Sequence, residues 1–150
     1  MLKQPIMREP YPLEDNLGYL LNRCALAIAA QFEKELASFD VTLAQWGALI
    51  AIDAGRASTP SELARAVGID KGAATRLIAR LSAKKLVERE ENLEDGRSTL
   101  LTLSAEAREL MPTLTALSKK VNNEMLALLS PSEGRQLKAL LARLTDKLIS

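Results

Sequence analysis

The sequence predicts a mainly helical protein with a minor β component. Three observations carry this prediction. Aromatic residues make up only 3% of the 150 residues, 47% are hydrophobic, and much of that share is Leu and Ala, which favour helices over strands. Apolar residues also recur at spacings of three and four along most of the chain, which is typical of amphipathic helices. The length corresponds to one domain, alone or with an attached oligomerisation element.

The composition excludes several classes of protein. Because the chain has no histidine, a His-ligated zinc site and a Ser-His-Asp or Cys-His catalytic pair are impossible within it. The single cysteine, Cys24, excludes an intrachain disulfide and indicates a reducing, cytoplasmic environment. No apolar run is long enough to cross a bilayer, and the first residues lack the apolar stretch of a signal peptide. We therefore expect no enzyme, no metal and no other cofactor.

The first part of the chain predicts an irregular arm followed by two helices. Residues 1–12 contain three prolines and no periodicity, so we expect the arm there. An apolar stripe from residue 13 to about residue 40 predicts the first helix. Thr42 and Gln45 form a capping-box pattern that predicts the start of the second helix, and Gly55 marks its end.

The third and fourth helices have clear start signals. Thr59 is a cap residue, Pro60 suits the first helical position, and Glu62 is placed to complete a reciprocal capping box. Gly68 supplies the left-handed position that ends this short helix. Asp70 caps the fourth helix, which we expect to run to residues 81–85.

The pattern changes after the fourth helix. Residues 86–90 and 98–103 predict two short strands, and the polar segment between them predicts an antiparallel hairpin with a long exposed tip. Ser104 then caps a fifth helix, and Ser130 with Glu133 caps a sixth.

The third and fourth helices together predict a helix-turn-helix. Ala64 is small where the two helices must cross closely, and Gly68 follows at the turn. Apolar residues of the fourth helix, such as Ala74 and Leu77, would pack back against the third. The outward face is then small and cationic, which suits a DNA major groove; it comprises Lys71, Gly72, Thr75, Arg76, Ala79 and Arg80.

Charge is unevenly distributed although the chain carries a net charge of only +1. Residues 60–85 contain six basic and two acidic residues, whereas residues 86–97 contain two basic and five acidic residues. Positive charge is therefore concentrated on the helix-turn-helix. In the hairpin, Arg97 is a candidate for a narrow minor groove, with Asp95 holding its guanidinium in place.

Several segments, in this order and spacing, resemble the MarR family of bacterial winged-helix regulators over nearly the whole chain. The hairpin stretch Asp95-Gly-Arg97 looks like the family's D-x-R signature. Lys85 departs from the family pattern, because glycine is usual there. The other matching segments are Leu17-Gly-Tyr-Leu-Leu, Val41-Thr-Leu-Ala-Gln-Trp46, Pro60-Ser-Glu-Leu-Ala64, Val67-Gly-Ile-Asp-Lys71, Ala74-Thr-Arg-Leu-Ile78 and Leu86-Val-Glu-Arg89.

The resemblance implies a winged helix-turn-helix DNA-binding lobe at residues 41–103 and a helical dimerisation region at residues 13–40 and 104–150. It also implies a bacterial or archaeal transcriptional regulator, a repressor in our interpretation. The protein would bind a pseudo-palindromic operator in double-stranded DNA as a homodimer. The DNA contacts that it implies are Ser61, Lys71, Thr75, Arg76, Arg80 and Arg97, the last supported by Asp95.

The resemblance further implies a small-molecule effector, such as an aromatic or phenolic acid, that releases the DNA. Tyr19, Arg23 and Trp46 are candidates for lining its site at the junction of the first two helices. The plain alternative is that Trp46 belongs to the core and Arg23 is solvated. Leucines of the sixth helix form a near-heptad seam that predicts a subunit interface, although a hairpin between the last two helices would also bury some of them.

Two other functions stay open. The first is a winged-helix module that binds a protein through its acidic wing. The second is a redox-responsive regulator that uses Cys24, although this residue falls on the apolar stripe, where a cysteine usually packs as a small buried hydrophobe.

Overall fold

A computed structural model of the chain describes residues 11–91, 93–94 and 99–149. It confirms a mainly helical protein with one two-stranded antiparallel sheet. In chain order the elements are the 3-10 turn η1 (Leu13–Asp15), α1 (Leu17–Leu36), the 3-10 turn η2 (Ala37–Phe39), α2 (Leu43–Asp53), α3 (Pro60–Val67), α4 (Lys71–Ala83), β1 (Val87–Glu91), β2 (Thr99–Leu103), α5 (Ala105–Leu126) and α6 (Pro131–Ile149).

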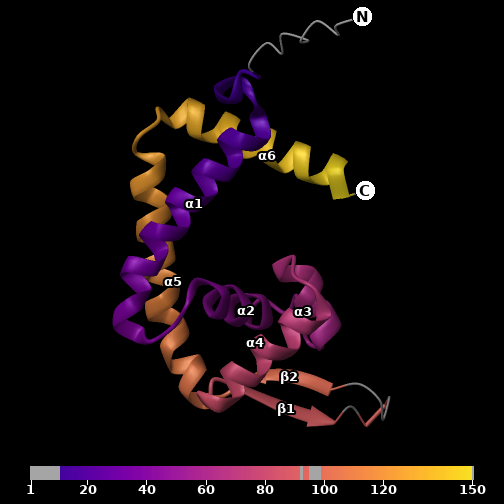
Figure 1. The fold of residues 1–150 in the computed structure, drawn as a ribbon. Coiled ribbons are helices and arrows are strands. Elements are labelled where there is room, and N and C mark those ends of the chain that lie inside the picture. Colours follow the sequence, from indigo (N-terminus) through magenta and orange to yellow (C-terminus); the bar gives the residue numbers. More distant parts are fainter. Residues whose placement is uncertain (1–10, 92, 95–98, 150) are drawn as a thin grey trace, which may run out of the picture.

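The elements form a stem and a lobe (Figure 1). The stem consists of the long helices α1 and α5, which pack against each other and are linked by an ion pair of 3.1 Å between Lys120 Nζ and Glu35 Oε1. The lobe consists of α2, α3, α4 and the β1–β2 hairpin at one end of the stem. Helix α6 lies at the other end of the stem. In chain order, the elements of the lobe come between the two stem helices α1 and α5.

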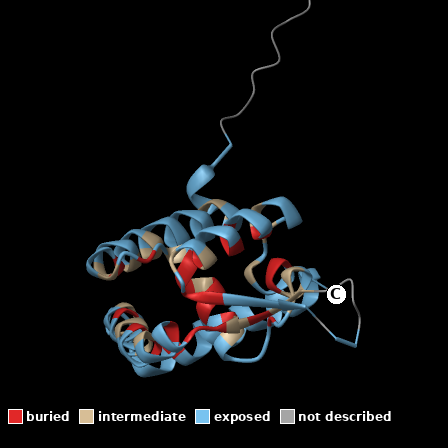
Figure 2. Cartoon of the chain, turned by 90° about the horizontal axis from the view of Figure 1, so that it is seen from below, coloured by how far each residue is buried: buried red, intermediate tan, exposed pale blue. Residues whose placement is uncertain are grey.

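The hydrophobic core lies in the lobe and at its junction with the stem. Figure 2 shows that buried residues gather there, whereas the outer turns of the long helices are exposed. Burial of apolar side chains is the main force that holds such a unit together. The fully buried large side chains are Leu36, Leu49, Leu63, Leu81, Leu114 and Val121.

Most predicted helix starts are confirmed by their capping bonds. Thr42 Oγ1 accepts a hydrogen bond from the N–H of Gln45 at 3.2 Å, and Gln45 Oε1 accepts one from the N–H of Thr42 at 3.1 Å. Ser130 and Glu133 form the same reciprocal pair at the start of α6. These bonds satisfy backbone donors that a helix cannot satisfy itself.

The predicted bounds of the first helix are wrong at both ends. The chain forms the η1 turn after Pro12, and α1 begins only at Leu17, where the side chain of Asn16 accepts a hydrogen bond from the N–H of Tyr19. At the other end α1 stops at Leu36, because η2 and the left-handed residue Asp40 (φ 53°) turn the chain into the lobe.

The hairpin is confirmed; its first strand lies one residue later than predicted, and its second strand ends at the predicted Leu103. The strands are Val87–Glu91 and Thr99–Leu103, in a register that pairs Val87 with Leu103. Helix α4 ends at Ala83, before the predicted limit of Lys85. It stops there because Lys85 has a φ of 58°, which is incompatible with a right-handed helix.

Apolar side chains on α1 and α6 are less buried than in a typical core. The α6 seam is exposed, at 36–83% for its five leucines, and α6 turns away from α5 instead of folding back along it (Figure 1). The expected packing of Cys24 as a buried hydrophobe is wrong, because this residue of α1 is exposed in the chain. The seam leucines are Leu137, Leu140, Leu141, Leu144 and Leu148.

Candidate nucleic-acid interface

The start of α3 is held by two sets of hydrogen bonds. Thr59 Oγ1 accepts the N–H of Glu62 at 3.3 Å, as predicted. The Glu62 carboxylate reaches Ser58, accepting its hydroxyl at 2.7 Å and its backbone N–H at 2.8 Å. These two bonds from Ser58 lower the pKa of Glu62 below its usual 4.5, because they favour the charged carboxylate. The predicted partner was Thr59, so the cap extends one residue further back than the sequence indicated.

The turn between α3 and α4 has the predicted geometry. Gly68 has a φ of 75°, and the Ala64 carbonyl accepts hydrogen bonds from the N–H groups of Gly68 and Ile69, both at 2.9 Å. Ala64 is buried, as close crossing of the two helices requires. Asp70 then caps α4, its Oδ1 accepting the N–H of Ala73 at 2.8 Å. The turn therefore fixes the angle between the two helices.

Helix α4 has one buried and one exposed face, as predicted. The buried face contains Ala74, Leu77, Ile78 and Leu81. The exposed face carries the three cations, Lys71, Arg76 and Arg80. Between them Thr75 is also exposed, and its hydroxyl donates to the Lys71 carbonyl at 2.9 Å, which leaves its oxygen free to accept. The exposed face therefore offers cations and a hydroxyl to a groove of double-stranded DNA.

Ser61 lies beside this face. It occupies the first turn of α3 and is exposed. Together with Arg65 and Lys71 it lines an open groove of about 630 Å³ where α3 meets the start of α4. The structure therefore brings Ser61 and Lys71, which are ten residues apart in the sequence, to the same part of the surface.

The hairpin is anchored to the helix-turn-helix by its base. Val87, Leu101 and Leu103 are buried. The N–H of Leu101 donates to the carbonyl of Ser58 at 2.8 Å, which ties the second strand to the residues just before α3. Asp95 and Arg97, the predicted minor-groove pair, lie outside the described residues.

The three candidate effector-site residues do not come together. Tyr19 and Arg23 are neighbours on α1, with the Arg23 guanidinium 5.7 Å from the centre of the Tyr19 ring. Trp46 is buried in the lobe core, 5% exposed. About 20 Å of helix separates Arg23 from the end of α1, at 1.5 Å per residue. Trp46 is therefore a core residue, as the alternative interpretation expected. It lies apart from Tyr19 and Arg23 in the described chain.

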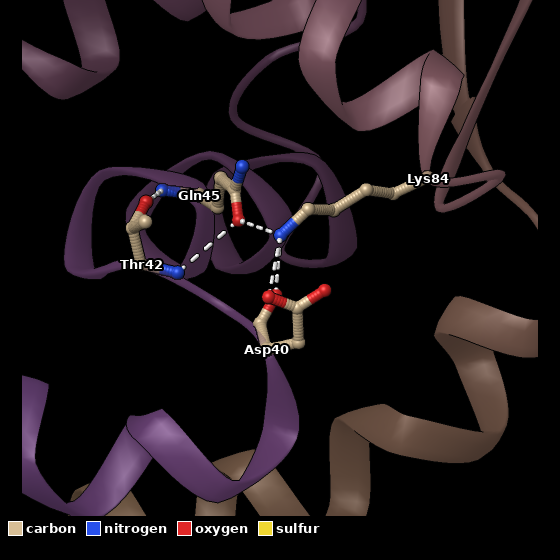
Figure 3. Close-up of polar contacts among 4 residues, drawn as sticks. All are labelled: Asp40, Thr42, Gln45 and Lys84. Atoms are coloured by element: carbon tan, nitrogen blue, oxygen red, sulfur yellow. Dashed lines mark hydrogen bonds and ion pairs between the residues drawn. The ribbon is translucent and has the colours of Figure 1, made fainter.

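Sequence reasoning missed the role of Lys84. Its ammonium donates to the backbone carbonyl of Asp40 and, at 3.2 Å, to Gln45 Oε1 (Figure 3). It also forms an ion pair of 3.4 Å with Asp40 Oδ1. These contacts join the end of α4 to the connection between α1 and α2. No local pattern signals them, since Lys84 lies 44 residues from Asp40.

Within the described ranges, no group of three or more His, Cys, Asp or Glu side chains is arranged to hold a metal ion. Nor does any helix in those ranges have the length and apolar character required to cross a membrane.

The geometry is that of a winged helix-turn-helix, and comparison with known proteins identifies its class. A family model described as "MarR family" matches residues 39–98. The HTH-type transcriptional repressor NicR of Pseudomonas putida is 22% identical over 142 residues, covering 95% of this chain and 90% of the relative.

Solved structures agree over nearly the whole chain. A structure of Bordetella bronchiseptica BpsR, from work on regulation of its DNA binding by 6-hydroxynicotinic acid, has a TM-score of 0.83 at 26% identity, covering 92% of this chain and 99% of that one. A mutant of Escherichia coli MarR in complex with operator DNA also has a TM-score of 0.83 at 26% identity, covering 91% and 99%. These comparisons support a DNA-binding transcriptional regulator of the MarR winged-helix type.

Proposed function

We propose that this protein is a repressor that binds a pseudo-palindromic operator as a homodimer and releases it when a small aromatic acid binds. The observation that carries the proposal is the cationic exposed face of α4, in a chain whose helices α1 and α6 expose leucines. The first feature suits DNA and the second suits a second copy of the chain.

In this proposal each lobe reads one half-site. Helix α4 enters the major groove with Lys71, Thr75, Arg76 and Arg80 toward the bases and phosphates. Ser61 binds a backbone phosphate through its hydroxyl and its backbone N–H at the start of α3. Arg97 of the wing enters the adjacent minor groove, with Asp95 holding its guanidinium.

A homodimer supplies the specificity that one lobe lacks. A single recognition helix contacts only a few base pairs, too few for a unique genomic address, whereas a two-fold dimer reads two half-sites about one turn apart. The exposed leucines of α6 and of the outer half of α1 are the surface that we assign to this contact. Their exposure supports the dimer because monomeric proteins rarely leave such apolar area in water. These residues include Leu17, Leu20 and Leu21 on α1 and Leu137, Leu140, Leu141 and Leu144 on α6.

An aromatic acid is the effector class that we favour. NicR is named as a repressor, and the BpsR structure comes from work on regulation of that protein's DNA binding by 6-hydroxynicotinic acid. In this chain the Arg23–Tyr19 pair on α1 offers a guanidinium for a carboxylate and a ring for stacking. A ligand that binds there releases the DNA if it favours a half-site separation that does not fit the operator.

The first experiment selects bound fragments from genomic DNA and titrates them in gel-shift assays. We expect one specific fragment class, a dimeric mass by light scattering, and release by 6-hydroxynicotinic acid or a related aromatic acid but not by acetate. A monomeric mass at micromolar concentration would remove the dimer from the proposal, and affinity unchanged by the whole acid panel would remove the effector class.

The same titration separates the two alternatives. DNA binding weakens steeply as salt rises, with a slope set by the number of phosphates contacted, whereas a protein bound through apolar contacts responds little. For redox control, Cys24→Ser would keep full DNA binding and lose a response to peroxide. If both proteins respond equally to peroxide, Cys24 has no such role.

A further inference from the structure

We infer that Lys84 is a positioning residue for DNA reading. Its ammonium fixes the end of the recognition helix α4 to the corner where the stem enters the lobe, and this sets the angle at which α4 is presented. The inference rests on the proposed reading of two half-sites by a dimer. It concerns a residue that neither the recognition face nor the wing includes.

The corner that Lys84 holds is a tight change of chain direction. Asp40 follows the last turn of the stem helix and has a φ of 53°, a left-handed conformation that a non-glycine residue adopts only at some energetic cost. Thr42 and Gln45 begin α2 two residues later. Lys84 contacts both sides of this corner, through Asp40 on the stem side and through Gln45 on the lobe side (Figure 3).

The contact on the lobe side is sheltered from solvent. Gln45 is only 4% exposed, and its Oε1 accepts both from the N–H of Thr42 and from the ammonium of Lys84. A charge-assisted bond to such a sheltered oxygen is stronger than an exposed ion pair. The Asp40 carboxylate adds less, because that side chain is 94% exposed. We therefore assign most of the restraint to the Gln45 oxygen and the Asp40 carbonyl.

The Lys84 ammonium is turned toward the corner, where Asp40 and Gln45 hold it (Figure 3). Lys84 follows Leu77 by about two helical turns, so the two side chains leave α4 in nearly the same direction, toward the lobe interior. Only 31% of its side chain is exposed. Lys84 therefore acts through the corner and not by touching a phosphate, because its ammonium is held by Asp40 and Gln45.

The consequence is a link between stem geometry and half-site spacing. If α1 and α6 hold the partner, the angle between stem and α4 determines how far apart the two recognition helices lie. A loose corner allows several separations, so affinity for the best spacing falls while affinity for neighbouring spacings falls less. Specificity for spacing is therefore the property that Lys84 controls.

The test compares Lys84→Met with the matched control Lys85→Met in the full chain. Lys85 is the next residue, exposed and equally charged. Affinities are measured for the selected operator and for versions with the half-sites moved by one base pair in either direction, each over a range of salt. We expect Lys84→Met to lose about fivefold or more on the best spacing, to show a flattened spacing preference and to keep the wild-type salt slope.

Two results would overturn the inference. One is a spacing preference for Lys84→Met that equals that of Lys85→Met. The other is a salt slope that falls by about one unit, which indicates a direct phosphate contact. If wild-type protein itself shows no preference for paired half-sites, the proposed function fails and not this inference alone.

A second variant guards against loss of folding. Lys84→Met leaves Gln45 Oε1 with the N–H of Thr42, so we expect the lobe to fold. If its thermal unfolding shows otherwise, Gln45→Met decides, because it removes the sheltered oxygen that holds the Lys84 ammonium while Thr42 Oγ1 can still accept the N–H of residue 45. A shift in spacing preference in the same direction supports the inference, and an unchanged preference contradicts it.

Discussion

Lys85 occupies a backbone position that suits glycine. Its N–H donates to the Ser82 carbonyl at 3.0 Å, the N–H of Leu86 donates to the Leu81 carbonyl at 2.9 Å, and its φ is 58°. Together these features define a Schellman turn at the end of α4. The same turn ends α2 with Gly55, at a φ of 67°. Lys85 therefore carries a steric cost that a glycine avoids.

We predict that Lys85→Gly raises the free energy of unfolding by about 1 kcal/mol, because it relieves this cost by more than it adds in chain entropy. The measurement is urea unfolding followed by circular dichroism. Lys85→Ala is the control, since it removes the same charge but keeps the strain. An equal gain in both variants would assign the effect to charge and not to backbone conformation.

The ionisation of Glu62 makes the stability of the start of α3 depend on pH. The Ser58 hydroxyl and N–H hold the pKa of Glu62 below 4.5 in the folded protein. A carboxyl whose pKa is lower when folded stabilises the fold above its unfolded pKa, and this stabilisation is lost as pH falls through the folded value. We predict that Glu62→Gln lowers the melting temperature at neutral pH and that the difference from wild type shrinks once pH falls below 4.5.

Glu109→Gln on the exposed face of α5 is the control for that experiment, because it removes the same charge without a capping role. A difference between Glu62→Gln and wild type that persists unchanged at low pH would show that the charged carboxylate is not what stabilises this helix start.

Among the elements, the wing is the one whose contribution to DNA binding depends most on a single side chain. It is acidic apart from two arginines, so it cannot coat phosphates broadly. We predict that Arg97→Ala weakens operator binding by more than tenfold, about 1.4 kcal/mol, because one guanidinium in a narrow minor groove carries the contact. Gel-shift titration at fixed salt measures this.

Arg135→Ala, at the exposed start of α6, is the matched control for Arg97→Ala. If the two variants bind the operator with equal affinity, the wing has no part in recognition and the exposed face of α4 carries it alone.

The elements themselves were largely predictable because their signals are local. Thr42 with Gln45, Gly68 at the turn and Ser130 with Glu133 each act within a few residues, and each has the geometry that its pattern predicts. The buried and exposed faces of α4 also follow from the spacing of its apolar residues alone. The start of α1 was missed because a 3-10 turn satisfies the same apolar spacing over three residues.

At the scale of the whole molecule, the net charge of +1 conceals an arrangement suited to selective binding. The basic residues of segment 60–85 other than Lys84 are exposed on the helix-turn-helix, while the neighbouring wing is acidic. An acidic wing disfavours loose, non-specific association with DNA, because that association depends on broad phosphate contact. Affinity must then come from a fitted site.

We predict that the double variant Leu140→Asp and Leu144→Asp is monomeric and loses specific operator binding by at least about a hundredfold. Both side chains are about two-fifths exposed, so the folded chain tolerates the change while an apolar subunit contact does not. Light scattering gives the mass, and circular dichroism checks the fold. Ala142→Asp, on the opposite side of α6, should stay dimeric; equal masses for the two proteins would refute the assigned interface.

The features that the sequence could not predict are those that depend on how distant parts of the molecule are arranged. The Lys84 bridge joins residues far apart in the chain, and the exposure of Cys24 depends on what covers the outer half of α1. Periodicity shows that a face is apolar but not whether its own chain or another covers it. The separation of Arg23 from Trp46 is likewise a matter of where a long helix points.

The continuity of α5 gives the molecule a mechanical property. Ser104 caps α5 directly after the last strand of the wing, so one continuous helix of 22 residues connects the wing's base to the neighbourhood of α6. Such a helix is about 33 Å long, and a tilt of about 5° at its far end displaces the near end by about 3 Å, close to the roughly 3.4 Å rise of one base pair. Because α5 is this long, a small tilt at its far end moves the base of the wing along the DNA by about one base-pair step.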